Sequence, residues 1–415
     1  MTATRDDRPL LLLVATGMRT YREYLLRSIS AEYRVHLFSH VEPEWEKEYV
    51  SGWTVLPSTM DGPAMAEAAR GLAADHEFAG VLCWDEARIH AASFVAQALG
   101  VRNGDPAVVW RLRDKGQTRA TLDAADVPQP RSIPVKTADD AVVAADKVGY
   151  PAILKPRGLG ASLGVIKVLD ADGIRANFAF TEKAEGPEPV VFDTDQPILV
   201  EEFVSGEEIS VDSVVRDGRV TPVFVGRKVV GYHPYAEEIG HFVDADDPLL
   251  TDPVLADVLQ RTHDALGFTD GVTHSEFMLT ADGPKVIEVN GRLGGDLIPY
   301  LGLLATGVDP GAFAAAAATG RTPDLEPRHR KVAGIRFFYV AEEDTTLGSL
   351  GFEESRLPEG IDRAVAVAAP GAVVSPPPRG TVWGRIAFAI ATGSSRDQVA
   401  QRLDAAEAAF VVTPA

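Results

Sequence analysis

The first 85 residues alternate between short apolar runs and longer stretches in which apolar residues recur with helical spacing. Two of the helical stretches are Thr20–Ile29 and Ala64–Asp75. The apolar runs, each about the length of one strand, cover 10–15, 33–39, 53–57 and 79–84. This alternation predicts an open α/β sheet, and such sheets bind ligands near the ends of their strands. Gly17 and the pair Asp85 and Glu86 follow strands of this kind and are candidates for a cleft.

The pattern changes after residue 105. The spacing predicts one helix from about 106 to 124, which ends before Pro128 because a proline disfavours helix at the residue preceding it. Closely spaced apolar runs with Asp-Gly turn signals follow, and they predict an antiparallel α+β region. Beyond about residue 330 the chain returns to short strands and a terminal helix near 396–409.

We therefore expect a mixed α/β and α+β protein with four structural segments. An open α/β domain (1–112) precedes two α+β lobes (113–198 and 199–330). A C-terminal subdomain of strands and helices (331–415) completes the chain.

Composition narrows the function classes. The chain is 46% hydrophobic and 24% charged, and its longest apolar runs are far below the roughly 20 residues that span a bilayer, so we expect no membrane association. A single cysteine, Cys83, excludes an intrachain disulfide framework and a cysteine-rich zinc site, and we expect a cytoplasmic location. The net charge of −20 argues against a nucleic-acid partner. It remains compatible with a nucleotide cofactor, which local cations can bind.

Two neighbouring apolar runs each carry a glutamate. In VIEVN, Glu288 and Asn290 leave the same face of the predicted strand. The preceding run, THSEFMLT, carries Glu276, and the two runs should form a hairpin. With a three-residue loop at 281–283, Glu276 lies directly opposite Glu288, whereas a two-residue Asp-Gly turn would put the glutamates on opposite faces. Pro284 argues against the tight turn because the closing hydrogen bond needs the N–H that proline lacks.

Opposed glutamates are destabilising unless a cation lies between them. Two carboxylates and an amide oxygen suit Mg²⁺, which keeps several waters and usually shares its coordination shell with phosphates. Arg292 follows this strand and could hold a transferring phosphoryl group, while the glycines at 294–295 would let backbone approach a ligand. The alternative is a surface hairpin with solvated glutamates and a surface ion pair at Arg292.

A second region combines a lysine with a glycine-rich loop. Lys155 lies on a predicted strand, and the loop Gly158–Gly164 leads to another strand, so it is neither a Walker loop nor a dinucleotide fingerprint. Ser162 and the backbone N–H groups of this loop could clamp phosphate, with Lys155 supplying charge and Lys115 lying on the preceding helix. The alternative is a plain flexible hairpin.

The run ILVEEFVSGEEISVD supplies a third candidate region. Its first strand ends in Glu201, Glu202, Phe203 and Val204, whose backbone edge could read an adenine. Glu208, a few residues on, could accept hydrogen bonds from ribose hydroxyls. Acidic residues that solvate an edge strand are the alternative.

Taken in order, these segments resemble the ATP-grasp superfamily, and more closely its carboxylate–amine ligase branch, which includes amino-acid ligases. The resemblance covers roughly residues 80–345 and rests on RDKGQTR, AILKPRGLGASLGV, ILVEEFVSGEEISVD, EIGHF, HSEFMLT and VIEVNGRLGGDLIPY. It implies an ATP-grasp fold in which two α+β lobes clasp ATP behind a pre-ATP-grasp domain. Together with the loop, it gives these candidates for ATP binding: Lys115, Lys155, Gly160, Ser162, Glu201, Glu202, Phe203, Val204 and Glu208.

The same resemblance assigns Glu276, Glu288 and Asn290 to Mg²⁺, with Mn²⁺ as an alternative. Its catalytic candidates are Arg292, Lys155 and His241 of EIGHF, although His241 is equally compatible with a structural histidine.

The implied reaction joins a small-molecule carboxylate to an amine through an acyl phosphate, with loop 158–164 as a mobile lid and the loop-like stretch 227–248 lining the substrate pocket. The sequence allows a homodimer. The rival interpretations are a purine-pathway or bicarbonate-using ligase of the same superfamily, a nucleotide-binding regulatory module without turnover, and an acidic scaffold.

Overall fold

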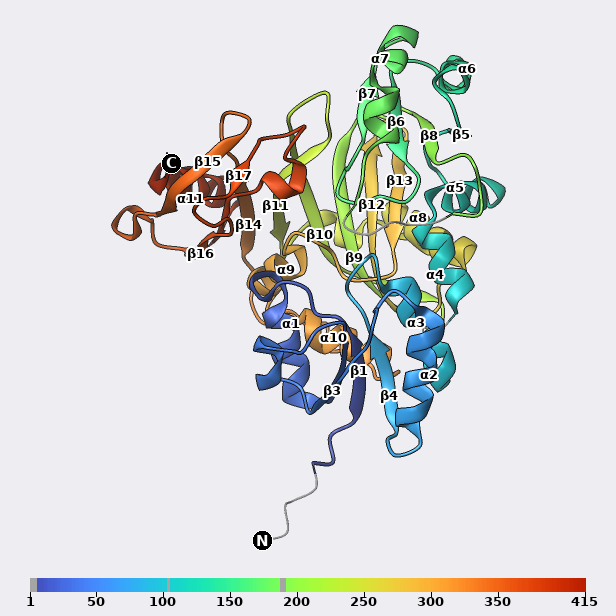
Figure 1. Ribbon diagram of the computed structural model, residues 1–415, viewed down its shortest axis with the longest axis vertical. Helices are drawn as coiled ribbons and strands as arrows, with labels where there is room; N and C mark the ends of the chain where they lie inside the picture. Colours follow the sequence, from blue (N-terminus) through green and yellow to red (C-terminus); the bar gives the residue numbers. More distant parts are fainter. Residues whose placement is uncertain (1–5, 103–104, 187–191) are drawn as a thin grey trace.

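The computed structural model describes residues 6–102, 105–186 and 192–415 of the chain. Its N-terminal unit is built on a parallel sheet with the order β3-β2-β1-β4 (Figure 1). The four predicted runs form its strands: β1 (Leu10–Val14), β2 (Arg34–Ser39), β3 (Gly52–Val55) and β4 (Phe78–Leu82). The helical segments of this unit are α1 (Arg19–Glu32), η1 (Trp45–Glu48), α2 (Gly62–Ala73) and α3 (Ile89–Leu99). The expected open α/β unit is confirmed.

The single helix predicted over 106–124 is wrong, because the chain breaks at Asp114. The two helices are α4 (Pro106–Arg113) and α5 (Lys115–Ala124). The Asp114 carboxylate accepts hydrogen bonds from the backbone N–H groups of Gly116 (2.9 Å) and Gln117 (3.3 Å), which caps the second helix. The break places Lys115 at the first position of α5.

A four-stranded antiparallel sheet with the order β5-β8-β6-β7 forms the next unit, at the top of Figure 1. Its strands are β5 (Ser132–Val135), β6 (Ala152–Pro156), β7 (Ile166–Val168) and β8 (Ile198–Glu202). Helices α6 (Ala138–Val148) and α7 (Ala171–Glu182) share an apolar core with these strands. Glu201 pairs with Ile153, so Lys155, two residues further along β6, leaves the same face as Glu201.

An antiparallel sheet with the order β13-β12-β9-β10-β11-β14-β18-β16 forms the centre of the molecule. Its strands are β9 (Glu207–Arg216), β10 (Arg219–Gly231), β11 (Glu237–Asp244), β12 (Gly271–Thr280), β13 (Gly283–Asn290), β14 (Val332–Phe338), β16 (Ile361–Ala366) and β18 (Ala387–Gly393). Helix α8 (Pro253–Leu266) packs on this sheet. The stretch 227–248, expected as a loop, consists mostly of β10 and β11.

Two apolar helices, α9 (Ile298–Thr306) and α10 (Pro310–Ala318), join the N-terminal unit to the large sheet. One continuous core cluster includes Leu13 of β1, Phe224 of β10 and Phe313 of α10. Strand β4 and the end of α10 lie so close together that glycine is required at residue 80, because a Cβ there would lie 2.5 Å from the backbone oxygen of Ala318. Among the described residues no single helix has the length and apolar composition of a membrane span, although the bent pair α9 and α10 passes that test jointly.

The C-terminal region adds a small sheet with the order β17-β15-β19. Its helix, α11 (Arg396–Ala409), agrees closely with the helix predicted near 396–409 and precedes the last strand. Its strands are β15 (Thr345–Phe352), β17 (Val373–Val374) and β19 (Phe410–Pro414). The remaining 3₁₀ turns are η2 (Pro248–Thr251), η3 (Glu354–Arg356) and η4 (Thr381–Gly384). The four-segment division stays a prediction: β8 begins at its border near 198, and β14, just beyond its border at 330, belongs to the large sheet.

Candidate active site

The hairpin of β12 and β13 presents the two predicted carboxylates opposite each other, but not by the predicted route. The strands are joined by a two-residue loop, because Thr280 already pairs with Gly283. The expected three-residue loop is therefore wrong. A bulge at Ile287 then shifts the register by one residue, so that Glu276 pairs with Glu288 as predicted.

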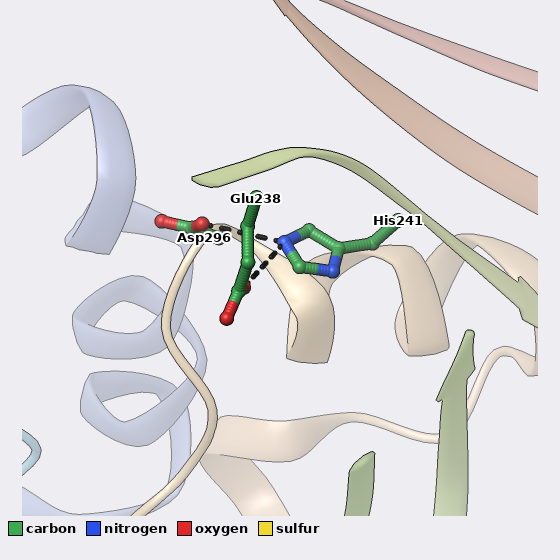
Figure 2. A group of neighbouring side chains, drawn as sticks. All are labelled: Glu238, His241 and Asp296. Atoms are coloured by element: carbon green, nitrogen blue, oxygen red, sulfur yellow. Dashed lines mark hydrogen bonds and ion pairs between the residues drawn. The ribbon is translucent and has the colours of Figure 1, made fainter. Parts of the chain in front are cut away.

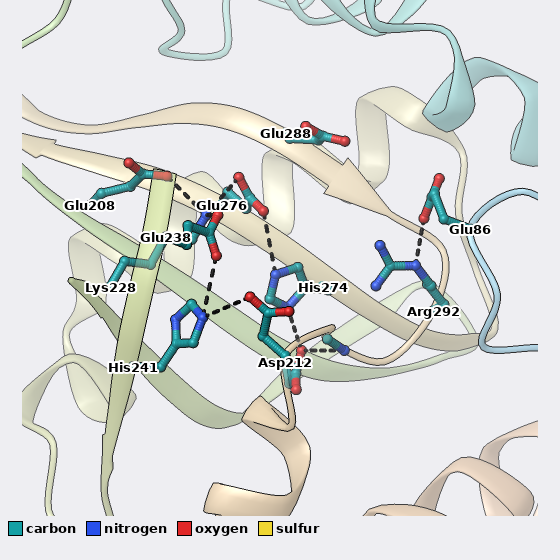
Figure 3. Close-up of polar contacts among 12 residues, drawn as sticks. Glu86, Glu208, Asp212, Lys228, Glu238, His241, His274, Glu276, Glu288 and Arg292 are labelled. Atoms are coloured by element: carbon teal, nitrogen blue, oxygen red, sulfur yellow. Dashed lines mark hydrogen bonds and ion pairs between the residues drawn. The ribbon is translucent and has the colours of Figure 1, made fainter. Parts of the chain in front are cut away.

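Glu276 belongs to a cluster of three carboxylates around one buried ammonium group. Lys228 Nζ lies 2.9 Å from Glu208, 2.8 Å from Glu238 and 3.0 Å from Glu276 (Figure 3). Burial alone would lower the pKa of Lys228, but the three carboxylates outweigh burial and raise it well above its usual value. Lys228 therefore supplies a fixed positive charge beside the candidate metal ligand and the candidate ribose ligand Glu208.

A second cluster surrounds Glu288, and Figure 3 shows Glu288 near the Glu86–Arg292 pair. Lys115 Nζ lies 3.0 Å from the Glu288 carboxylate and also donates to the Leu159 carbonyl at 2.6 Å. With its nitrogen turned towards the carboxylates, the Asn290 amide donates to Glu288 at 3.2 Å and to Glu86 at 3.1 Å. Glu86 in turn accepts from Arg292 Nε at 2.6 Å. Glu276 and Glu288 are thus each neutralised by a lysine.

A buried aspartate–histidine pair supports Glu276 from behind. His274 Nδ1 lies 2.7 Å from Asp212, and His274 Nε2 lies 3.5 Å from the Glu276 carboxylate. Asp212 also accepts the backbone N–H of Gly294 at 3.2 Å. Burial would lower the pKa of His274, but Asp212 and Glu276 raise it to about 9. The pair therefore connects a candidate metal ligand to the loop that carries Arg292.

Figure 2 shows a third group, Glu238, His241 and Asp296, which meets at the buried ring of His241. His241 Nε2 lies 3.3 Å from Glu238 and 3.3 Å from Asp296. Asp296 also receives two hydrogen bonds from Arg385, at 2.7 and 2.9 Å. A histidine and two carboxylates could hold a cation, and here, as at Glu276 and Glu288, cationic side chains now contact both carboxylates: Lys228 contacts Glu238 and Arg385 contacts Asp296.

Arg385 brings the C-terminal region into the site. Its guanidinium stacks 3.7 Å from the centroid of Phe337 and donates to the Tyr339 hydroxyl at 3.1 Å. That hydroxyl donates to Glu237 at 2.7 Å, and burial raises the pKa of Glu237 to about 7. Asp296 itself has a left-handed backbone conformation, with φ of 50°. Such strain is tolerated where surrounding contacts fix the residue, as Arg385 does here.

Lys155 lies in a separate buried ion-pair group. Its ammonium is 2.7 Å from Glu201, which also accepts from Arg119 Nε at 2.7 Å. Burial would raise the pKa of Glu201, but Arg119 and Lys155 outweigh it and lower the pKa to about 2. Burial lowers the pKa of Lys155 to about 8 despite this partner. The Glu201 carboxylate is thus already paired, and Lys115 is the lysine in contact with Glu288.

The remaining candidates for ATP binding lie on the strand end that follows Glu201 and in the glycine loop. Glu202 is half-buried and lies 3.4 Å from Lys285, Val204 is buried, and the Phe203 ring lies 3.7 Å below the ammonium of Lys167. The glycine loop adopts successive turns, with Ser162 at a φ of 54° and open space at Gly160. These residues lie where a nucleotide could be held, and their roles stay predictions.

The donor set fits a hard divalent cation. Two carboxylates face each other, with lysine ammonium groups beside both where positive charge is required, and Asn290 would add its amide oxygen once its nitrogen turns away from Glu288. Glu276, Glu288 and Asn290 are thus brought together with Arg292. The sequence analysis did not single out Lys228, Asp212 or Arg385, since only long-range packing brings them here, and it passed over Asp296 although this residue lies in the Arg292 loop itself. It had singled out Glu86 only as a strand-end residue.

Comparison with known proteins places these residues in a family. Residues 148–299 match the ATP-grasp domain. An uncharacterized protein, y4rH, of Sinorhizobium fredii is 31% identical over 299 residues, which cover 70% of this chain and 57% of that protein. The alanine–anticapsin ligase of Bacillus amyloliquefaciens is 26% identical over 199 residues, 44% of this chain and 41% of that enzyme. The chain thus spans about half the length of these curated relatives.

The fold comparison covers nearly the whole chain. The crystal structure of an L-amino acid ligase from Bacillus licheniformis superposes with a TM-score of 0.80 at 20% sequence identity. The superposition covers 98% of this chain and 99% of that one. The expected ATP-grasp fold is confirmed.

Proposed function

This chain carries an ATP-grasp domain within an ATP-grasp fold, and from that premise we propose that it is an ATP-dependent carboxylate–amine ligase. It would form an amide bond through an acyl phosphate and release ADP and phosphate. An amino acid or a similar carboxylic acid is the proposed acyl donor. The observation that carries this proposal is the pairing of Glu276 with Glu288, with a lysine on each carboxylate and Arg292 beside them.

In the proposed reaction the substrate carboxylate attacks the γ-phosphorus of ATP, and ADP leaves. The amine then attacks the acyl carbon, loses a proton and displaces phosphate. Glu276, Glu288 and Asn290 would hold Mg²⁺ or Mn²⁺, which when bound neutralises phosphate charge.

Lysine and arginine side chains of the chain would neutralise the remaining negative charge of the phosphates. Lys115 and Lys228, now bound to carboxylates, are placed to exchange those partners for phosphate oxygens. Arg292 keeps free guanidinium donors after its bond to Glu86 and could hold the transferring group. Lys115 also contacts the Leu159 carbonyl, so the glycine loop is tied to the same lysine and could exclude water when it closes.

The test is a phosphate-release screen of paired amino acids and other carboxylates with ATP and Mg²⁺, followed by mass spectrometry of the product. We expect ADP, phosphate and a condensed product in equal amounts. ADP release that requires bicarbonate or a phosphoribosyl amine would favour the rival ligases instead. ATP binding without phosphate release across the panel would favour a regulatory module and overturn the proposal.

A further inference from the structure

Among the described residues, one arginine beside the Arg292 loop, Arg22, has no carboxylate within ion-pairing distance. Arg22 lies on α1 of the N-terminal unit, and its Nη1 reaches the Gly294 carbonyl at 3.4 Å. Gly294 follows Arg292 by two residues, so Arg22 meets the loop that carries the candidate phosphoryl-binding arginine. Figure 2 shows a helix in the blue of the N-terminal unit beside Asp296 of the same loop.

The other shielded cations around the loop are each paired with a carboxylate. Arg292 pairs with Glu86 at 2.6 Å, and Arg385 pairs with Asp296 at 2.7 Å. Within the described part of the chain, Arg22 forms no ion pair and only the one long hydrogen bond. A guanidinium has five N–H donors, so most of those on Arg22 are left without a protein acceptor.

Arg22 is also shielded from solvent and lies beside another arginine. Its side chain is partly buried, and its Cγ would lie 3.6 Å from a Cβ placed on Gly17. Burial lowers the pKa of Arg22 and the charge of Arg292 lowers it further, and these effects outweigh Tyr24, Asp85 and Asp296, which raise it. Two guanidinium groups that disfavour each other would both be stabilised by an anion between or beside them.

From this geometry we propose that Arg22 binds a carboxylate that the ligase reaction does not consume. The inference rests on the proposed function. The reacting groups already have Arg292, Lys115 and Lys228, whereas Arg22 comes from another unit and joins the loop beyond Arg292. The bound group would be the carboxylate of an amino acid that serves as the amine, or a second carboxylate on the acid.

The kinetic test compares L-alanine with L-alaninamide as the amine, and succinate with propionate as the acid. Arg22→Met should reduce the preference for the substrate with the extra carboxylate by about 10- to 100-fold, mainly through KM, as expected for loss of a charge-assisted hydrogen bond. Arg27→Met is the matched control, because Arg27 is an exposed residue of the same helix. Whichever pair of substrates loses its preference identifies the source of the carboxylate.

A second test does not depend on turnover. Phenylglyoxal labelling followed by peptide mass spectrometry measures how accessible each arginine is. Arg22 should react faster than Arg292 and Arg385, and 20 mM glycine or succinate should protect it at least about 5-fold, while glycinamide should not.

The two tests separate this inference from the proposed function. Absence of phosphate release in the wild type would overturn the ligase proposal, whereas labelling of Arg22 would still decide the anion site. Equal labelling with and without glycine and succinate would overturn the anion site. A rise in KM for every acid with no change in either preference would assign Arg22 to the reacting carboxylate and also overturn the inference.

Discussion

Glu276 lies directly opposite Glu288 only because the strand between the turn and Glu288 carries one extra residue. The turn alone would set a register in which Glu276 faces Ile287, and Glu288 would then leave the other side of the sheet. A bulge of this kind next to functional residues re-aims a side chain.

Insertion of an alanine between Ile287 and Glu288 should therefore destroy the proposed metal site while leaving the hairpin able to form, because a one-residue bulge would then place the alanine opposite Glu276 and turn Glu288 to the other face. We expect Glu288 to turn away from Lys115, and turnover to fall at least about 10³-fold, because the metal ligands would no longer converge. Ile287→Ala keeps the bulge and serves as the control, with turnover within about 5-fold of the wild type. Binding of Mn²⁺ followed by electron paramagnetic resonance, in the presence of a non-hydrolysable ATP analogue, measures the site directly. Unchanged Mn²⁺ affinity in the insertion variant would contradict the assignment.

The two adjacent glycines of the Arg292 loop should respond differently to alanine. A Cβ at Gly294 would lie 2.9 Å from His274 Nδ1 and 3.1 Å from an Asp212 oxygen, whereas a Cβ at Gly295 meets nothing within 4 Å. Gly294→Ala should therefore displace the Asp212–His274 pair and lower kcat about 100-fold, and Gly295→Ala should stay within about 3-fold. Steady-state kinetics measures kcat of both variants, and circular dichroism checks that both are folded. Equal effects at the two positions would argue against a positioning role for the pair.

Glu201 should make stability depend on pH. Its pKa falls from 4.5 to about 2 on folding, so its contribution is present above pH 4.5 and is lost as the pH falls towards 2. The full contribution is about 3 kcal/mol, from about 1.4 kcal/mol per pKa unit. Glu201→Gln should lack this component, so its unfolding free energy in urea should differ less between pH 6 and pH 3 than that of the wild type. If the unfolding free energies of the two proteins changed with pH in parallel, the ion pairs of Glu201 with Lys155 and Arg119 would contribute nothing to stability.

Asp296 and Arg385 should behave as a coupled pair. Asp296→Asn and Arg385→Met each leave one buried charge unbalanced, so each should lower the unfolding free energy by about 3 kcal/mol. The double variant should lose clearly less than the sum, because it leaves neither charge alone. Urea titration of all four proteins gives the coupling energy, and a value near zero would mean that Arg385 does not hold the loop.

The contact that strand alternation predicted joins residues that lie near each other in the chain, whereas Lys115, 173 residues from Glu288, received its ATP-binding role from the family resemblance. The Glu276–Glu288 pairing was predictable because a short hairpin and strand alternation determine it, although the tight loop and the compensating bulge were not. Lys228, Asp212 and Arg385 were not found, because β9, β10 and β18 meet the hairpin and the Arg292 loop only through the order of the large sheet. Strand order depends on long-range packing, which one sequence does not reveal without further information. The break at Asp114 was missed because the apolar spacing continues through it, although an aspartate followed by a helical run is a capping signal.

The large sheet runs without interruption from the β12–β13 hairpin through β11 to β14, β18 and β16. Excising the matched domain at residue 299 would therefore strip β11 of its neighbour and leave its backbone donors and acceptors unsatisfied. An unpaired strand edge of that sort pairs with other molecules, so such a fragment should aggregate rather than reproduce the properties of the whole chain.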